Sequence, residues 1–88
     1  MRHATAAALN RLAPLLAALR AFSALREPKP GVFYRGSQAF LHFHADPAGD
    51  FADVKVGREW ERARVVTQRE RAALLRRVRA LLAIPAAQ

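Results

Sequence analysis

The chain of 88 residues contains no cysteine. This absence excludes disulfide bridges and thiolate metal sites, and with them a disulfide-stapled secreted fold. Stability must therefore come from the burial of apolar side chains, alone or together with a partner chain. Because 52% of the residues are hydrophobic, we expect one small domain, residues 1–88, with a packed core.

Acidic residues are scarce. Seven Asp and Glu stand against 15 Lys and Arg, which gives a formal net charge of +8. A balance of this sign attracts nucleic acid, anionic membranes or acidic proteins. Nearly all the basic residues are arginine, and alanine is abundant, which is also the composition that a GC-rich genome produces through codon usage. The charge alone leaves a functional origin and a codon-usage origin open.

Long apolar runs are missing as well. None approaches the ~20 residues that a membrane span requires, so no membrane partner is expected. Asn10, Arg11 and Pro14 interrupt the N-terminal apolar stretch, which argues against a secretory signal. A docked helix of a bacterial cytoplasmic protein is favoured over a transit peptide. The sequence also lacks glycine-rich phosphate loops, zinc-knuckle spacings and helix–turn–helix signatures.

The apolar spacing predicts a helix over residues 5–26, within a helical segment 1–27, with Thr5 as its N-cap. Pro14 predicts either a kink or a helix that begins near Ala13 and Pro14, where a first-turn proline is tolerated. The segment Glu27-Pro28-Lys29-Pro30-Gly31 should end the helix, because residues before proline avoid the helical region. The apolar stripe consists of Leu9, Leu12, Leu16, Leu19 and Phe22, with Leu15 beside it.

A second helix is predicted over residues 67–84. Thr67 and Glu70 have the spacing of a capping box, and Pro85 follows the last turn. The apolar stripe of this helix is Leu74, Leu75, Val78, Leu81 and Leu82.

Between the helices, residues 31–66 predict an antiparallel sheet. Alternating residues indicate strands at 32–35, 38–44 and 51–56, and a fourth at 60–66. Gly36-Ser37 is a two-residue hairpin turn, and Asp46-Pro47-Ala48-Gly49 is a turn that the Asp side chain closes. The predicted fold class is therefore α+β with two layers: an N-terminal helix, an antiparallel sheet of three or four strands, and a C-terminal helix.

The hairpin turn sets Phe33 opposite Phe40, and a second pairing sets His44 opposite Phe51. With Leu41, Phe43 and Val54 turned toward the helices, the other face becomes the predicted binding surface. Its apolar rings could be buried against a second copy of the chain, which gives a homodimer, or could stack on the bases of single-stranded nucleic acid. The predicted binding residues are Phe33, Arg35, Phe40, His42, His44, Phe51, Asp53 and Lys55.

His42 and His44 are two residues apart on one strand, so both rings project from one face, and Asp53 is expected opposite His42. These three residues could bind a divalent metal, could transfer protons, or could form an ordinary cross-strand pair. Asp46 and Asp50 flank the turn that follows. No serine lies beside either histidine, so we assign no catalytic residue, lean against an enzyme, and expect no cofactor other than a divalent metal.

From Lys29 to the end of the last helix the chain resembles small uncharacterised bacterial proteins with an H-F-H-x-D-P-x-G hairpin. The residues that carry the resemblance are P-G-V-F-Y-R-G at 30–36, F-L-H-F-H-A-D-P-A-G-D-F-A-D-V at 40–54, and T-Q-R-E-R at 67–71. The chain is also similar to the YjbR-like family, with Arg35-Gly36-Ser37 at the position of that family's short turn. The resemblance implies DNA binding through a basic surface and supplies no catalytic residue.

The sequence therefore predicts a small non-catalytic binding or interaction domain that associates with nucleic acid or with itself. The alternative is a metal-dependent or histidine-dependent site at the central hairpin.

Overall fold

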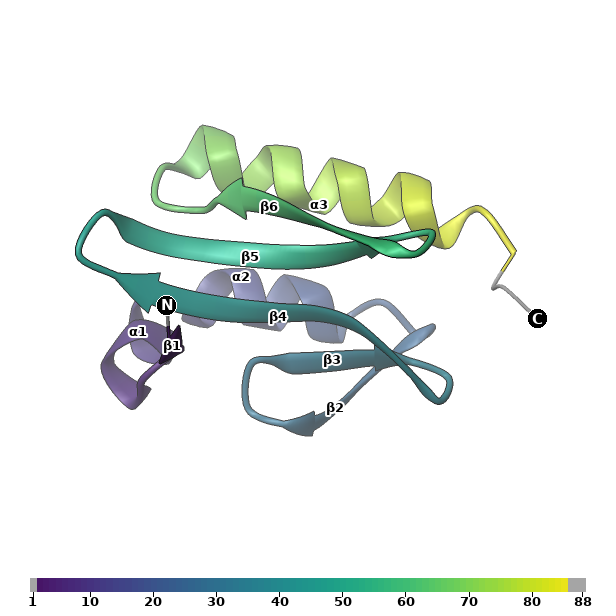
Figure 1. Cartoon of the computed structure of the whole chain (residues 1–88), viewed down its shortest axis with the longest axis horizontal. Coiled ribbons are helices and arrows are strands. Elements are labelled where there is room, and N and C mark those ends of the chain that lie inside the picture. Colours follow the sequence, from purple (N-terminus) through teal and green to yellow (C-terminus); the bar gives the residue numbers. More distant parts are fainter. Residues whose placement is uncertain (1, 86–88) are drawn as a thin grey trace.

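A computed structural model describes residues 2–85, with side chains from Ala4 onward (Figure 1). The elements follow one another as β1 (Arg2–His3), α1 (Ala6–Arg11), α2 (Ala13–Arg20), β2 (Leu25–Lys29), β3 (Val32–Arg35), β4 (Gln38–Asp46), β5 (Gly49–Val56), β6 (Glu59–Arg64) and α3 (Gln68–Leu82).

All the strand pairs are antiparallel, and the main order is β2-β3-β4-β5-β6. The two-residue strand β1 pairs with β4 and places His3 opposite His44 in the backbone register. The α+β class with helices at either end of the chain is confirmed. The main order holds five strands rather than three or four, because β2 was not expected and the strand expected at 60–66 is present as β6.

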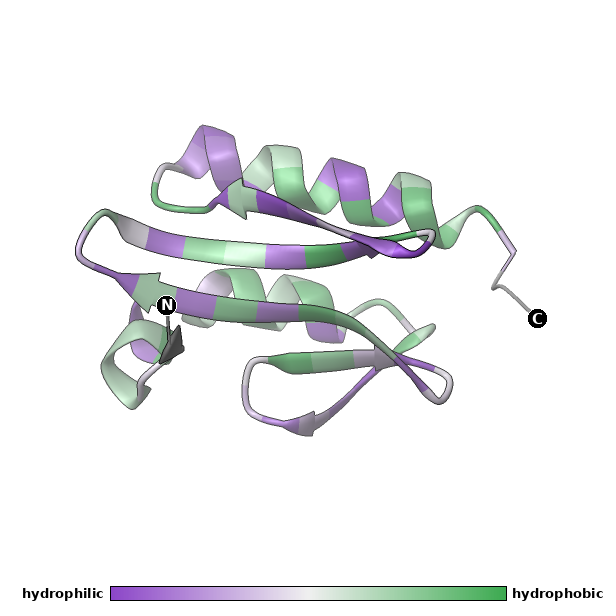
Figure 2. Ribbon diagram, viewed as in Figure 1, coloured by the Kyte–Doolittle hydropathy of each residue, from purple (hydrophilic) through white to green (hydrophobic). Residues whose placement is uncertain are grey.

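The helices cover one face of the sheet. In Figure 1, α2 passes behind β4 and α3 runs along β6. The core between the layers is formed by buried residues from α2, from α3 and from the strands. Along β4 and β5 hydrophilic and hydrophobic residues alternate, as expected for strands with one covered face (Figure 2). Within residues 2–85, no helix is long and apolar enough to cross a membrane.

The N-terminal helix is interrupted just before Pro14, as the sequence predicted. The Thr5 side chain accepts a hydrogen bond from the Ala8 backbone N–H at 3.2 Å, which confirms the N-cap. Helix α1 ends at Arg11, and α2 begins at Ala13 with Pro14 in its first turn, where no hydrogen bond is lost. The prediction of helix as far as residue 26 is wrong, because α2 ends at Arg20.

Strand β2 lies where the sequence predicted the end of a helix. Residues that precede proline prefer extended backbone, so Glu27 before Pro28 fits a strand as well as a helix stop. Proline is tolerated there because β2 is an edge strand, and its register with β3 shifts between Arg26 and Lys29. Pro30 and Gly31 (φ 77°) form the turn into β3.

A bulge in β4 changes which residues share a face. Arg35 pairs with Gln38 and Tyr34 with Ala39, as predicted from the Gly36-Ser37 turn. The register then shifts by one residue, so Phe33 lies opposite Leu41 instead of Phe40. Val32, which a regular hairpin from this turn would set opposite Leu41, pairs with His42 for the same reason.

The bulge moves two phenylalanines into the core. Phe33 is 1% exposed and Phe40 is 5% exposed, and both belong to the cluster packed under the helices. Full burial of a phenylalanine side chain contributes about 1.5–3 kcal/mol, whereas a missing hydrogen bond in the ladder costs about 0.5–1.5 kcal/mol. The prediction that Phe33 and Phe40 lie on the uncovered face is therefore wrong, and burial explains why.

Arg35 also lies on the covered side and has a structural role. Its guanidinium donates hydrogen bonds to the backbone carbonyls of Leu81, Leu82 and Ile84, at 3.4, 3.3 and 2.6 Å. A cation at this end of α3 also interacts favourably with the helix dipole. The opposite end of α3 has the predicted capping box between Thr67 and Glu70. Arg35 is thus a C-terminal cap of α3.

We predict that Arg35→Ala lowers the free energy of unfolding by about 1–2 kcal/mol, because it leaves these carbonyls without a charged donor. Chemical denaturation measures this change. Arg76→Ala is the matched control, since Arg76 is an exposed residue of α3 and its replacement removes the same charge. Equal stability of the two variants would show that Arg35 does not cap the helix.

Candidate functional site: the uncovered face of the sheet

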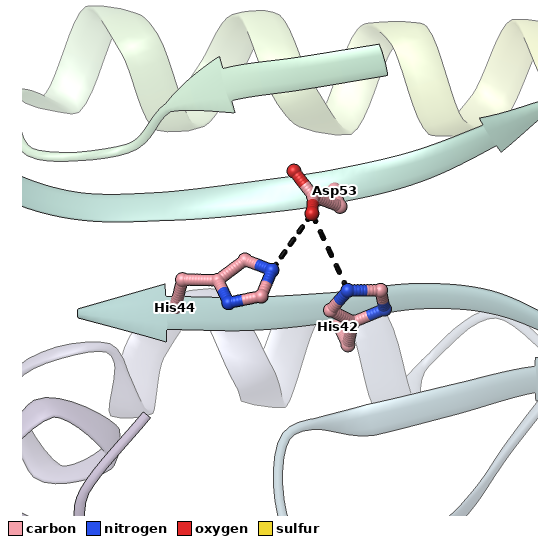
Figure 3. A group of neighbouring side chains, drawn as sticks. All are labelled: His42, His44 and Asp53. Carbon is pink, nitrogen blue, oxygen red and sulfur yellow. Dashed lines mark hydrogen bonds and ion pairs between the residues drawn. The ribbon is translucent and has the colours of Figure 1, made fainter. Parts of the chain in front are cut away.

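The β4–β5 ladder brings together the polar residues that the sequence pointed to. Leu41 pairs with Val54, and His42 pairs with Asp53, as predicted. The ladder continues to Asp46 opposite Gly49, so the connecting loop is shorter than expected. Figure 3 shows His42, His44 and Asp53 converging on the side of the sheet away from the helices.

Asp53 is the centre of this group. His44 Nε2 lies 2.7 Å and His42 Nε2 lies 3.3 Å from the same carboxylate oxygen, Oδ2. Arg62, opposite Asp53 in β6, donates from Nε to Oδ1 at 2.8 Å and from Nη2 to Oδ2 at 3.0 Å. His44 and Asp53 are buried, 9% and 7% exposed. We call these four residues the Asp53 cluster.

The Asp53 carboxyl group is ionised at neutral pH. The hydrogen bond from Arg62 is the main cause that lowers the pKa of Asp53 from 3.8 to about 2, and the hydrogen bond with His44 lowers it further, against the opposing effect of burial. The same contact with Asp53 raises the pKa of Arg62. The carboxylate therefore stays ionised, and the Arg62 guanidinium balances its charge.

His42, His44 and Asp53 could also hold a metal ion. Each offers one ligand atom, and these atoms lie within 4.8 Å of one another. Two imidazoles and a carboxylate form a donor set that zinc and related divalent ions accept.

Beside the Asp53 cluster the uncovered face is hollowed. The hollow has a volume of about 490 Å³, within the range of small-ligand sites. Both the single tyrosine and the single tryptophan of the chain line it. We call it the aromatic hollow, and its lining residues are Arg26, Pro28, Lys29, Val32, Tyr34, Ala39, His42 and Trp60.

A cationic side chain lies over the ring of Tyr34 and another lies over the ring of Trp60. The Arg26 guanidinium lies 5.0 Å from the Tyr34 ring centre, and the Lys55 ammonium lies 4.9 Å from the Trp60 ring centre. The His42 ring meets Trp60 edge-on, with 4.7 Å between centroids. Trp60 is 41% exposed, which is unusual for so large an apolar side chain. His42 belongs to both the hollow and the Asp53 cluster.

The structure therefore keeps part of the predicted binding surface. The ladders place His42, His44, Phe51, Asp53 and Lys55 on the uncovered face. Phe33, Phe40 and Arg35 are not there, for the reasons given above.

Asp46 and Asp50, the two acids beside the turn, are not members of the Asp53 cluster, although the negative charge of Asp46 adds to the effect of Asp53 in raising the pKa of Arg62. Asp46 Oδ1 accepts a hydrogen bond from the Ala48 backbone N–H at 2.7 Å, which confirms its role in closing the turn. Asp50 is buried against Arg11 of α1 in a salt bridge of 2.9 Å. Neither belongs to the group of possible metal ligands, which consists of His42, His44 and Asp53.

Sequence reasoning missed the hollow. Tyr34 was not among the predicted binding residues, and the bulge at Phe40 places it on the uncovered face. Arg26 and Lys29 were assigned to a helix and its end, although they belong to β2. The available signal was the pair Pro30-Gly31, which has the residue order of a turn between two strands.

Comparison of the chain with protein-family models, with curated proteins and with solved structures finds no match. The geometry of the uncovered face is therefore the main basis for assigning a function to the chain.

We predict that the Asp53 cluster makes stability pH-dependent in acid. Because the folded pKa of about 2 lies below the ordinary 3.8, the stabilisation is fully present above about pH 4 and disappears as the pH falls through 2. This contribution should be about 2 kcal/mol. Urea denaturation between pH 4 and pH 2, with chelator present, should show the decrease in the wild type and a flatter profile in Asp53→Asn.

Arg62→Met tests whether Arg62 is the cause of the lowered pKa of Asp53. It removes the main hydrogen bond that lowers the Asp53 pKa, so its profile should flatten as well. If Asp53→Asn loses stability in acid as steeply as the wild type, another group is responsible.

Proposed function

We propose that the chain is a non-catalytic binding domain that takes single-stranded nucleic acid on the uncovered face of its sheet. The observation that carries the proposal is the aromatic hollow, where Tyr34 and Trp60 stand beside cations on a face that no helix of residues 2–85 covers. The resemblance to the YjbR-like family points to the same class of ligand.

Base stacking supplies the first part of the affinity. Proteins bind single strands by stacking successive bases on aromatic side chains, and each stack contributes about 1–3 kcal/mol. An antiparallel sheet with exposed aromatic side chains is a common platform for this. Tyr34 and Trp60 come from β3 and β6, on opposite sides of β4 and β5, so they flank the hollow.

Phosphate contacts supply the second part. Arg26, Lys29 and Lys55 lie at or beside the hollow, within reach of a strand whose bases stack there. The net charge of +8 adds a long-range attraction for any polyanion. Asp53 does not oppose it strongly, because Arg62 balances its charge.

The same face offers little support for catalysis. No serine, threonine or cysteine is among the residues that line the aromatic hollow, so a covalent mechanism based on an aliphatic hydroxyl or a thiol has no nucleophile there. Asp53 is held ionised by Arg62, which makes it a poor proton donor or acceptor near neutral pH. A histidine-dependent enzyme is therefore less well supported than a binding domain.

The homodimer expected from the sequence rested on a surface of three phenylalanines. Phe33 and Phe40 are buried in the chain's own core, so that surface is not formed. Nucleic acid remains the ligand class for which the exposed side chains have complementary charge.

We predict that Trp60→Ala weakens binding of a fluorescent single-stranded oligonucleotide by about 10-fold, since the variant has one stacking platform fewer. Fluorescence anisotropy at low salt measures the affinity. In the wild type, the emission of Trp60, the only tryptophan, should change on titration with the oligonucleotide. Ile84→Ala is the control, because Ile84 is an exposed apolar residue that does not line the hollow.

Equal affinities of wild type and Trp60→Ala would contradict the proposal, and so would tighter binding of a duplex than of a single strand. A Trp60→Ala variant that halves the mass measured by light scattering would instead assign the face to a second copy of the chain.

The salt dependence gives a separate prediction. Lys29→Ala with Lys55→Ala should reduce the slope of log affinity against log salt by about 1.4, because each lysine that pairs with a phosphate contributes about 0.7 to the slope. Arg69→Ala with Arg76→Ala, on the exposed side of α3, removes the same charge and should leave most of the slope intact. Identical slopes for the two double variants would show that binding follows net charge and not this face.

A further inference from the structure

The contacts of a single oxygen in the Asp53 cluster are unusual. Oδ2 of Asp53 faces Nη2 of Arg62, Nε2 of His44 and Nε2 of His42, at 3.0, 2.7 and 3.3 Å. A carboxylate oxygen has two lone pairs, so three nitrogen neighbours exceed what it can accept with good geometry. The longest contact, to His42, is the one that hydrogen bonding explains least.

A metal ion would resolve this crowding. We propose that His42, His44 and Asp53 bind a divalent cation of the zinc type, with His42 Nε2, His44 Nε2 and Asp53 Oδ2 as ligands. The cation would stand between the two imidazole Nε2 atoms and the carboxylate oxygen, and each neutral ring would then carry its proton on Nδ1. The proposal does not depend on nucleic-acid binding.

The distances are compatible with such a site. In a tetrahedral zinc site with bonds near 2.1 Å, neighbouring ligand atoms stand about 3.3–3.5 Å apart. The His42–Asp53 contact is already at 3.3 Å, and the His44–Asp53 contact needs to open by less than about 1 Å. The ligand atoms that the three residues offer lie within 4.8 Å of one another, so the widest pair has to approach by about 1.4 Å at most to reach tetrahedral spacing.

The backbone holds the ligands in place. His42 and His44 come from β4 and Asp53 from β5, within a ladder of six pairs that has no register shift. Sites on such regular elements are more precise than sites on loops. His44 and Asp53 are buried, which limits competition from water.

Arg62 is the main obstacle, because its positive charge lies against the same carboxylate. However, its Nε contacts Oδ1, which leaves Oδ2 for the metal if the second contact, from Nη2, is released. Arg62 would then orient the carboxylate from outside the coordination shell, a role that outer hydrogen-bond donors commonly have in metal sites.

The donor set decides the kind of ion. Imidazole nitrogen suits zinc, nickel, cobalt and copper, whereas magnesium and calcium prefer oxygen ligands. With three protein ligands, one coordination position is left for water or an added ligand. His42 also contacts Trp60, so a metal on His42 should alter the emission of that tryptophan.

Isothermal titration of chelator-treated, untagged protein with zinc chloride tests the proposal. We expect one zinc per chain with a dissociation constant in the micromolar range or below, and no displacement by millimolar magnesium. His44→Gln and Asp53→Asn should each weaken binding by at least about 100-fold, because each removes a ligand. The visible spectrum of the cobalt form should change in both variants.

Both substitutions keep a side chain that can hydrogen-bond, and circular dichroism checks that each variant is folded. Glu61→Gln is the control, since Glu61 lies on neighbouring β6 and pairs with Arg77 outside the cluster. Zinc binding that is no tighter in the wild type than in a folded His42→Gln, His44→Gln double variant would overturn the proposal. This outcome leaves the oligonucleotide experiments unaffected, so the two proposals can fail separately.

Discussion

The need to bury Phe33 and Phe40 is the constraint on which the rest of the structure depends. A regular hairpin from the Gly36-Ser37 turn would leave both rings on the face without helices. One extra residue in β4 shifts the register and places both rings in the core. The cost is a local break in the ladder, and the gain is the burial of two large apolar side chains, which exceeds it. The same shift sends Val32 and Tyr34 outward, so the aromatic hollow is a consequence of how the core is filled.

The features of the fold that depend on local chemistry could be predicted from the sequence. Thr5 and the Thr67–Glu70 pair cap helices, and the pairing of His42 with Asp53 follows from the alternation of β4 and β5. These features depend on neighbours in the chain or on a strict period of two, and both can be recognised without knowledge of the tertiary structure. The Asp53 cluster was therefore predicted in its essentials, except for the contact with Arg62.

The features that the sequence did not predict depend on contacts between distant parts of the chain. Nothing near Phe40 in the sequence signals a bulge, because its cause is the space under α3 and the other helices. The segment Leu25–Lys29 was misassigned because extended backbone before proline suits a helix stop and an edge strand equally well. Arg35 looked like a surface cation, yet the end of α3 lies within its reach and the carbonyls of that end accept its hydrogen bonds. In each case a tertiary contact overrides the local pattern.

His42 connects the two halves of the uncovered face. Its ring lies between Trp60 of the aromatic hollow, at 4.7 Å between centroids, and His44 of the Asp53 cluster, at 4.8 Å. A change in the charge or metal ligation of His42 would therefore change the electrostatic environment of Trp60, on which we expect a base to stack. A cation at the cluster would add positive charge next to the hollow, which favours a polyanion. Metal and nucleic acid bound at these two sites would then strengthen each other, because a favourable coupling between two sites acts equally in both directions.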